Sequence, residues 1–234
     1  MGDFIESASA ILATAERRVD LSAQNVSNMT TPGYKRRIAF QGMLAQDPSG
    51  GVGSQLISTF TDFSAGKLNE TGNPYDLAIS GDGFFAVRDG GQVAYTRAGQ
   101  FRRNGDGRLV TAQGAALQVL GGGDLVLRHG EVKVTGDGTV LEDGQPVARL
   151  AIVDFTDRQA AVPGDGGLLI VPEAQVIPVS APSVRQGALE ASNTSMGEEM
   201  VAMMEAMRRA EAGQRLVNVY DDLMGRALQT FGQV

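Results

Sequence analysis

The segment from Met200 to Val217 reads MVAMMEAMRRAEAGQRLV, and its pattern of apolar side chains decides how the rest of the chain is arranged. Apolar residues recur there at alternating steps of three and four, which places one stripe along a helix. The segment from Ile5 to Val26 has the same spacing. An isolated helix gains little stability, because most of it comes from packing the apolar face. We therefore expect the two ends to pair as a coiled-coil-like helical hairpin.

The expected seam of this hairpin, which would also serve assembly, consists of apolar residues at these steps. They are Ile5, Leu12, Val19, Val26, Met200, Met203, Met207 and Val217. A plain core stripe is the simpler interpretation of the same pattern. The N-terminal stripe also contains Ala8, Ala15 and Ser22, each of which buries apolar area worth on the order of 1 kcal/mol or less. A seam this narrow makes the hairpin marginal as a monomer, whereas unbranched methionines can repack against differently shaped neighbours.

Between the helical ends the period changes to two, from Leu77 to about Val179. Short alternating runs such as Phe84–Val87 are separated by glycine-rich turns, which is typical of strands joined by hairpins. The sequence thus predicts an α+β fold in which an all-β middle domain, a small barrel or sandwich, is inserted into the helical hairpin. The expected boundaries are 1–32 for the N-terminal helix, 33–76 for an extended linker, 77–182 for the β domain and 183–234 for the C-terminal return segment and helix.

Composition narrows the functional classes. The chain has 234 residues and a formal net charge of −7, which argues against binding to nucleic acid or an anionic membrane. It contains no cysteine and one histidine, His129, which we expect in an exposed turn. The sequence therefore lacks the thiol that thiol catalysis requires, and it has only one of the Cys and His ligands that zinc sites use. No run of about 18 apolar residues predicts a membrane span. We expect no catalytic residue, cofactor or metal, and no cleaved signal peptide.

The tripeptide Gly-Asp-Gly occurs four times, beginning at Gly81, Gly105, Gly136 and Gly164. Such oxygen-rich turns can ligate calcium when they repeat at a short fixed period. Here the spacing is irregular, so we expect ordinary turns, for which Asp and Gly are sterically suited.

Three groups of motifs stand out along the chain. The N-terminal group is Leu21–Asn28 followed by Thr31–Lys35; the middle group includes Asn73–Ile79, Gly81–Phe85 and Tyr95–Phe101; the C-terminal group is Gly187–Asn193. Together they resemble the rod and hook family of bacterial flagellar axial proteins, and they occur in that family's order over nearly the whole chain. The positions that carry the resemblance are Asn25, Asn28, Thr31, Gly33, Tyr34, Gly83, Phe84, Gly99, Phe101, Leu189, Glu190, Ser192 and Asn193.

The resemblance implies a structural subunit of the flagellar basal-body rod that polymerises into the drive shaft and transmits torque for swimming. The short middle domain favours a proximal-rod subunit, with a distal-rod or hook-type subunit as the alternative. Implied partners are the same and other rod subunits, hook-proximal and ring components, and the flagellar export apparatus. Implied localisation is the periplasm-spanning rod of the basal body. Asn25 and Asn28 are expected to bond backbone near the helix end, or simply to cap it.

Two other classes of protein compete with this interpretation. One is an enzyme or sugar-binding β protein with helical dimerisation arms, which would need a cleft with convergent polar groups. The other is a secreted calcium-binding β protein, whose melting temperature a chelator would lower.

Overall fold

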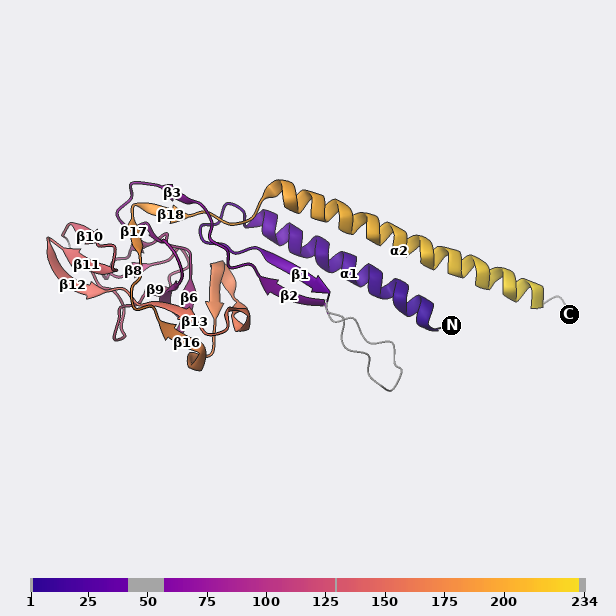
Figure 1. Ribbon diagram of the computed structural model, residues 1–234, viewed down its shortest axis with the longest axis horizontal. Helices are drawn as coiled ribbons and strands as arrows, with labels where there is room; N and C mark the ends of the chain where they lie inside the picture. Colours follow the sequence, from indigo (N-terminus) through magenta and orange to yellow (C-terminus); the bar gives the residue numbers. More distant parts are fainter. Residues whose placement is uncertain (1, 42–56, 129, 232–234) are drawn as a thin grey trace. The chain divides into compact units, whose positions relative to one another are not determined.

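The computed structural model describes residues 2–41, 57–128 and 130–231, which excludes His129 and the turn expected for it. The fold is α+β, with two helices and a largely β middle region (Figure 1). It divides into two compact units. The helical unit comprises Met1–Ser27, Arg37–Asp62 and Thr194–Val234, and the β unit comprises Asn28–Arg36 and Phe63–Asn193.

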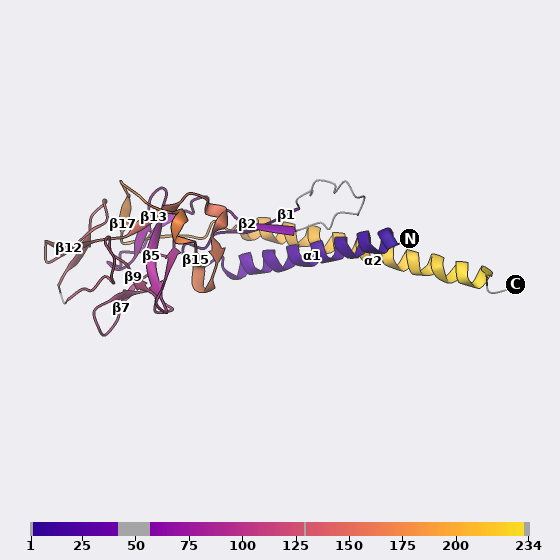
Figure 2. The ribbon, with the colours of Figure 1, turned by 90° about the horizontal axis from the view of Figure 1, so that it is seen from below.

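The helical unit contains α1 (Gly2–Ser27) and α2 (Met196–Phe231), which run antiparallel side by side in both views (Figures 1 and 2). At about 1.5 Å per residue the helices are roughly 39 and 54 Å long, so α2 extends past the first residues of α1. Strands β1 (Arg37–Gln41) and β2 (Ile57–Thr61) form an antiparallel pair, and β1 lies against α1. Helix α2 has Glu198 and Glu199 in its first turn, where the helix dipole favours acidic side chains.

The β unit is built from short strands. They are β3 (Leu68–Glu70), β4 (Leu77–Ile79), β5 (Phe84–Asp89), β6 (Gln92–Thr96), β7 (Arg102–Arg103), β8 (Leu109–Val110), β9 (Ala116–Leu117), β10 (Val132–Val134), β11 (Thr139–Glu142), β12 (Gln145–Arg149), β13 (Ile152–Phe155), β14 (Val162–Pro163), β15 (Leu168–Ile170), β16 (Val176–Pro178), β17 (Val184–Gln186) and β18 (Ala188–Glu190). Three single-turn 3-10 helices span Arg158–Ala160, Asp165–Gly167 and Glu173–Gln175.

These strands form several antiparallel sheets. The largest has the order β14-β15-β6-β5-β9-β8-β7, with β13 pairing with both β5 and β16. A three-stranded sheet has the order β10-β11-β12, and the pairs β17–β4 and β18–β3 form two further sheets. Among the residues described, none of these sheets closes on itself, so the structure shows an all-β region of several sheets without establishing a barrel.

The core of the β unit lies on both faces of β5. Because successive side chains of a strand point to opposite faces, Phe85 and Val87 enter one apolar cluster while Phe84 and Ala86 enter another. On the second face the Phe84 ring stacks on Phe155 with centroids 4.7 Å apart. Burial on both faces explains why β5 reads as a continuous apolar run rather than a simple alternation.

Local predictions and structure agree best where turns bracket an apolar run. The run Phe84–Val87 lies within β5, and all four Gly-Asp-Gly tripeptides occupy turns, bends or a 3-10 helix. The stretch 33–76, expected to be an extended linker, contains β1, β2 and β3 among its described residues. Strand β3 pairs with β18, more than 100 residues away in the sequence, which a local pattern could not reveal.

Candidate functional site

The contact between α1 and α2 is lined by small side chains. Ala8, Ala15 and Ser22 recur every seven residues along α1 and are almost completely buried. On α2 the buried positions have the same spacing: Glu199, Ala206 and Gly213. The small residues among them, Ala206 and Gly213, let the two helices pack closely, which larger side chains would prevent. Glu199 is the exception, a large side chain that is also buried.

Gly213 shows how close this packing is. In the middle of a helix, glycine costs about 1 kcal/mol relative to alanine. A Cβ atom at this position, however, would lie 3.2 Å from Cγ of Leu12 and 3.3 Å from Cγ2 of Ile11. The glycine therefore removes a side chain where α1 and α2 come together.

The residues predicted for the seam differ in how deeply they are buried. Leu12, Val19, Val26, Met203 and Val217 are partly buried, and the side chain of Ile5 lies outside the described part of the structure. Met200 and Met207 are half-exposed, because the buried positions of α2 are Glu199 and Ala206, one residue earlier in each case. The pattern of large apolar residues thus follows a different line along α2 from the one that faces α1.

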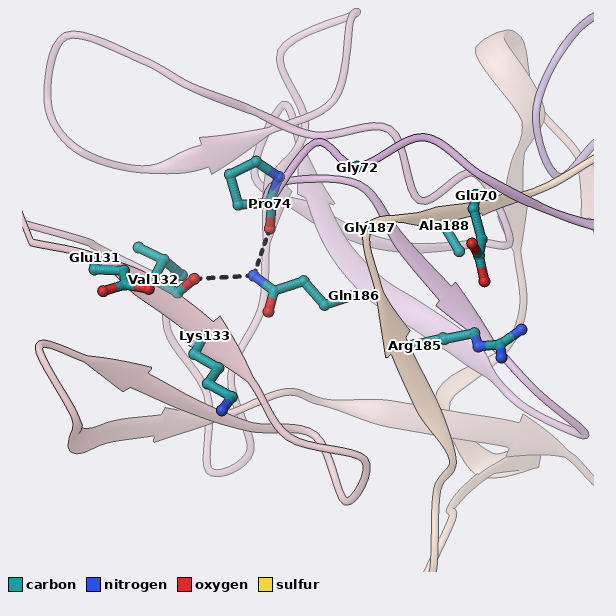
Figure 3. A pocket seen from close by; sticks show the side chains of 10 residues that line it. All are labelled: Glu70, Gly72, Pro74, Glu131, Val132, Lys133, Arg185, Gln186, Gly187 and Ala188. Carbon is teal, nitrogen blue, oxygen red and sulfur yellow. Dashed lines mark hydrogen bonds between the residues drawn. The ribbon is translucent and has the colours of Figure 1, made fainter.

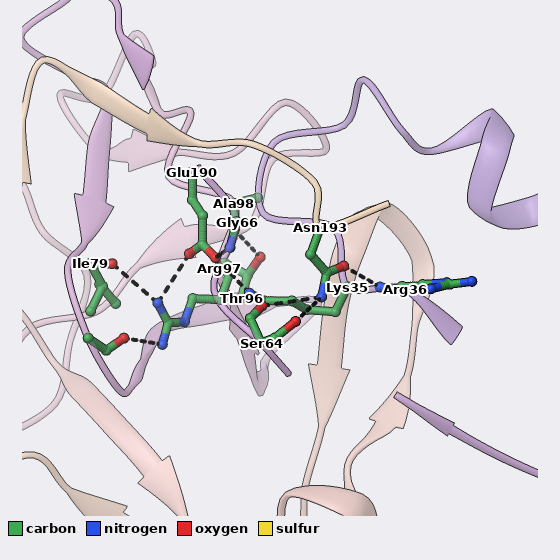
Figure 4. Close-up of polar contacts among 11 residues, drawn as sticks. Lys35, Arg36, Ser64, Gly66, Ile79, Thr96, Arg97, Ala98, Glu190 and Asn193 are labelled. Carbon is green, nitrogen blue, oxygen red and sulfur yellow. Dashed lines mark hydrogen bonds and ion pairs between the residues drawn. The ribbon is translucent and has the colours of Figure 1, made fainter. Parts of the chain in front are cut away.

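A buried ion network joins the three motif groups in the β unit (Figure 4). Glu190, at the end of β18, accepts from Nζ of Lys35 at 2.6 Å and from Nη1 of Arg97 at 3.1 Å. Its Oε1 also accepts from the backbone N–H of Gly66 at 2.8 Å. The three charged side chains are only 5%, 5% and 1% exposed for Lys35, Arg97 and Glu190. Two buried cations thus depend on one carboxylate.

Backbone carbonyls accept further hydrogen bonds from the two cations. Lys35 Nζ donates to the Ser64 carbonyl at 2.7 Å. Arg97 donates to the carbonyls of Ile79 and Gly81, at 3.3 and 2.6 Å, and its guanidinium lies over the Phe84 ring at 5.2 Å. Hydrogen bonds to charged groups are stronger than neutral ones, so this network holds five chain segments in one arrangement.

The motif residues around the network fix the same segments. The Asn193 side chain accepts from the Arg36 backbone N–H at 2.7 Å and donates to Ser64, carbonyl and hydroxyl. Gly33, at φ +69°, donates its N–H to the Glu190 carbonyl at 2.7 Å. A Cβ at Gly33 would lie 2.3 Å from the backbone of Arg97, so a larger residue is excluded.

The other motif residues also lie in the β unit and differ in how deeply they are buried. Gly99 packs so closely on β4 that a Cβ would clash with the Leu77 carbonyl oxygen. Gly83, Phe84 and Phe101 are buried. The partly buried motif residues are Thr31, Tyr34, Leu189 and Ser192.

The side chain of Asn25 bonds backbone, whereas Oδ1 of Asn28 accepts from the Thr31 hydroxyl at 3.4 Å. Asn25, on α1 and 1% exposed, donates to the Arg37 carbonyl at 2.8 Å and accepts from the Arg37 N–H at 2.9 Å. Its amide thus pairs with the first residue of β1 as a strand would. Asn28 carbonyl accepts from the Thr31 N–H at 3.0 Å, in the turn that follows the helix.

A polar groove in the β unit is closed on one side by Gln186 (Figure 3). Its amide nitrogen donates to the carbonyls of Pro74 and Val132, at 2.8 and 2.9 Å, and its oxygen accepts from the Val134 N–H at 3.0 Å. The side chain therefore takes the place of a neighbouring strand along β10. It joins the sheet of β10 to that of β17 and leaves no bare strand edge there for a ligand peptide.

Two titratable sites on the surface serve local structure. The Arg158 guanidinium holds the pKa of Asp154 below its ordinary value through direct hydrogen bonds. In the third Gly-Asp-Gly turn, hydroxyls of Thr135 and Thr139 lower the pKa of Asp137 to about 2. Within the described ranges, no three acidic or histidine side chains converge as a metal site would require, and no helix is long and apolar enough to cross a membrane.

Comparison with known proteins agrees with this arrangement of motifs. The model of the flagellar hook protein FlgE/F/G D1 domain matches residues 78–176, and that of the flagellar basal body rod FlgEFG protein C-terminal matches residues 185–230. The flagellar basal-body rod protein FlgF of Caulobacter vibrioides is 32% identical, and the alignment covers 94% of each chain. The chain belongs to the flagellar basal-body rod protein family.

Members of two types within the family are similar to this chain. FlgF of Salmonella typhimurium is 30% identical over 89% of this chain and 90% of its own length. FlgG of Bacillus subtilis is 25% identical over 89% of this chain and 91% of its own length. This order agrees with the assignment that the short middle domain favours, a FlgF-like proximal-rod subunit first and a FlgG-like distal-rod subunit second. These relatives are structural rod proteins, as the expectation of a non-enzymatic chain requires.

Lys35 and Arg97 were part of the quoted motifs, but sequence reasoning did not recognise them as partners of Glu190. The available signal was a single charged residue within each of three otherwise uncharged motifs, Thr31–Lys35, Tyr95–Phe101 and Gly187–Asn193. Nothing in the local spacing connects positions 35, 97 and 190, so the pairing itself needs the fold. The role of Gly213 also needs the fold, because it depends on how close α1 lies to this residue.

Proposed function

We propose that this chain is a structural subunit of the flagellar basal-body rod that polymerises through its terminal helices. The polymer would be the drive shaft that transmits torque, and its partners would be further copies, other rod subunits, and hook-proximal and ring components. Export through the flagellar apparatus without cleavage and a coiled-coil-like pairing of α1 and α2 belong to the same proposal. The expected domain boundaries after residues 32, 76 and 182 are also part of the proposal. No catalysis is required for any of these steps.

The observation that carries the proposal is the exposed apolar surface of α2. Among the side chains of this helix that the structure describes, eight large apolar ones are exposed although α2 is already paired with α1. They are Met196, Met200, Val201, Met204, Met207, Leu216, Val219 and Leu223. Many exposed apolar side chains on one helix favour an interaction surface. In a family of rod proteins, the neighbouring subunit is the partner that would cover it.

The β unit would contribute stiffness to such a subunit. A shaft under torque must resist slippage within each subunit as well as between subunits. The Lys35–Arg97–Glu190 network and the Gln186 amide cross-link separate sheets and segments of the β unit through charge-assisted and paired hydrogen bonds. These cross-links support a mechanical role, since they hold separate segments of the β unit in fixed positions relative to one another.

The proposal is tested by Met204→Asp in a strain that lacks its own copy of the gene. A carboxylate in an apolar contact costs several kcal/mol unless it is paired, so the variant should be missing from isolated basal bodies and the cells should not swim. Arg215→Asp is the matched control, because Arg215 is exposed on the same helix outside the apolar positions. The control should assemble.

Near-UV circular dichroism of purified Met204→Asp should show the tertiary signal and melting of the wild-type β unit. Normal swimming with the variant incorporated would contradict a role for α2 in assembly. Wild-type protein that is absent from isolated basal bodies would contradict the proposed function itself.

A further inference from the structure

The turn between β7 and β8 contains the only asparagine of the chain that precedes a glycine. The sequence has seven asparagines, and of these only Asn104 is followed by glycine, Gly105. In such a pair, the backbone nitrogen of the glycine can attack the side-chain carbonyl carbon of the asparagine, because no side chain on the glycine shields it. The asparagine then loses ammonia. The pair overlaps the second Gly-Asp-Gly tripeptide, which begins at Gly105.

The backbone of this turn holds the amide of Asn104 in one orientation. Its Oδ1 accepts from the backbone N–H groups of Asp106 and Arg108, at 3.0 and 2.9 Å. Two N–H donors aimed at the same atom identify that atom as the amide oxygen. Donors at this distance stabilise negative charge that develops on an oxygen, as they do in oxyanion holes. The turn therefore activates the carbonyl carbon of Asn104 toward attack.

The two nitrogens that would react have no partner in the turn. Among the residues that the structure describes, neither Nδ2 of Asn104 nor the backbone N–H of Gly105 makes a hydrogen bond. Gly105 is exposed, and a Cβ placed on it would meet no atom within 4 Å. Base in the solvent can therefore take the proton of the Gly105 nitrogen, and ammonia can leave from Asn104 without breaking a hydrogen bond.

We propose that Asn104 is a site of spontaneous deamidation and that the folded turn accelerates the reaction. Base removes the proton from the Gly105 nitrogen, which attacks Cγ of Asn104 while the two N–H donors stabilise the charge on Oδ1. The bond from Cγ to Nδ2 then breaks, and Nδ2 takes a proton from water and leaves as ammonia. Water opens the resulting succinimide ring at either carbonyl, and the Gly105 nitrogen regains its proton. The net reaction consumes water and releases ammonia.

The two products have different effects on the turn. Opening at Cγ gives aspartate, which keeps the backbone and adds one negative charge. Opening at the backbone carbonyl gives isoaspartate, which inserts a CH₂ group into the main chain. The Leu127 N–H donates to the Gly107 carbonyl at 2.7 Å, and a Cβ at Gly107 would lie 2.3 Å from the Leu127 carbonyl oxygen. A lengthened backbone strains this close contact, so isoaspartate should speed hydrogen exchange of the Leu127 amide.

Peptide mapping of the purified full-length chain, aged at neutral pH, tests the proposal. Mass spectrometry detects replacement of the Asn104 amide by a carboxyl group, and a protein isoaspartyl methyltransferase labels the isoaspartate product. Isomerisation of Asp106 would give the label without a change in mass. The folded chain should convert Asn104 about tenfold faster than the same chain unfolded in urea, because only the folded turn supplies the two donors.

Asp89→Asn provides a matched control within the same molecule. It creates a second Arg-Asn-Gly sequence, in the exposed turn between β5 and β6, at a side chain that accepts no hydrogen bond among the described residues. The introduced asparagine should convert about tenfold more slowly than Asn104 in the folded chain and equally fast in urea. Gly105→Pro removes the attacking N–H at the second position of the turn, where proline is favoured, and should abolish conversion of Asn104.

Three results would overturn the inference. In the first, Asn104 of the folded wild type converts no faster than in urea, which would mean that the turn protects the amide; this comparison needs no variant. In the second, the introduced asparagine keeps pace with Asn104 in the folded chain. In the third, Asn104 still deamidates in Gly105→Pro, which would mean that water attacks the amide directly.

Discussion

Removal of the carboxylate of Glu190 should destabilise the β unit more than any other single polar substitution in the network. Glu190→Gln keeps the size of the side chain but removes the carboxylate that the buried Lys35 ammonium and Arg97 guanidinium both contact. Breaking a buried ion pair from one side costs about 3–5 kcal/mol. For a domain of this size, that corresponds to a fall in melting temperature of roughly 10–20 °C.

The cost should be asymmetric between the partners. Lys35→Met leaves Glu190 paired with Arg97 at 3.1 Å, so the remaining pair stays neutral. We expect a loss of about 1–2 kcal/mol, chiefly from the hydrogen bonds of the ammonium group. In the double variant Lys35→Met with Glu190→Gln, the Arg97 guanidinium is the one cation of the network that loses the carboxylate. Its destabilisation should fall short of the sum of the two single effects by about 1 kcal/mol or more.

Urea unfolding followed by near-UV circular dichroism measures these free energies, because three of the four tyrosines lie in the β unit and there is no tryptophan. Asp82→Asn is the control, since Asp82 is exposed and its partner Arg158 keeps Asp154. It should cost less than about 1 kcal/mol. A Glu190→Gln protein that melts within a few degrees of wild type, or strictly additive single effects, would refute the buried network as a source of stability.

Three further predictions follow from contacts elsewhere in the chain. Gly213→Leu should overpack the contact with α1 at a cost of about 1–3 kcal/mol, seen as lower helicity at 222 nm, whereas Gly225→Leu, with open space around it, should not. Gln186→Leu should leave the edge of β10 unpaired and speed hydrogen exchange of its amides at a cost of about 1–3 kcal/mol. Thr135→Val should raise the pKa of Asp137 from about 2 toward 3.8 in an NMR titration. Because the folded pKa is depressed, the stabilising effect of this carboxylate is present above its ordinary pKa and is lost as the pH falls toward 2.

Sequence reasoning succeeded where the relevant information is local. The period of two and the turn residues place β5 and β6, and the apolar spacing places both helices. It failed for the exact face of α2 that meets α1. Large methionines gave the strongest apolar signal, yet the closest packing uses Ala206 and Gly213, which carry almost no such signal.

The candidate site shows the same division between local and distant information. The motif positions could be identified from the sequence, but their roles could not. Glu190 meets Lys35 across 155 positions and Arg97 across 93, and only the pairing of β18 with β3 brings its side chain to them. A buried charge has no periodicity, so its partner is visible only once the strands are in register.

The two units differ in which kind of side chain they bury and which kind they leave exposed. In the β unit, the Lys35–Arg97–Glu190 network is buried and joined by hydrogen bonds, which costs desolvation and holds the chain segments in a fixed arrangement. In the helical unit, apolar groups remain in water after α1 and α2 have paired. Exposed apolar surface lowers the solubility of a free subunit. The same surface stabilises an assembly when a neighbouring subunit buries it. The exposed apolar side chains of α2 are therefore the ones that we expect a neighbouring subunit to cover.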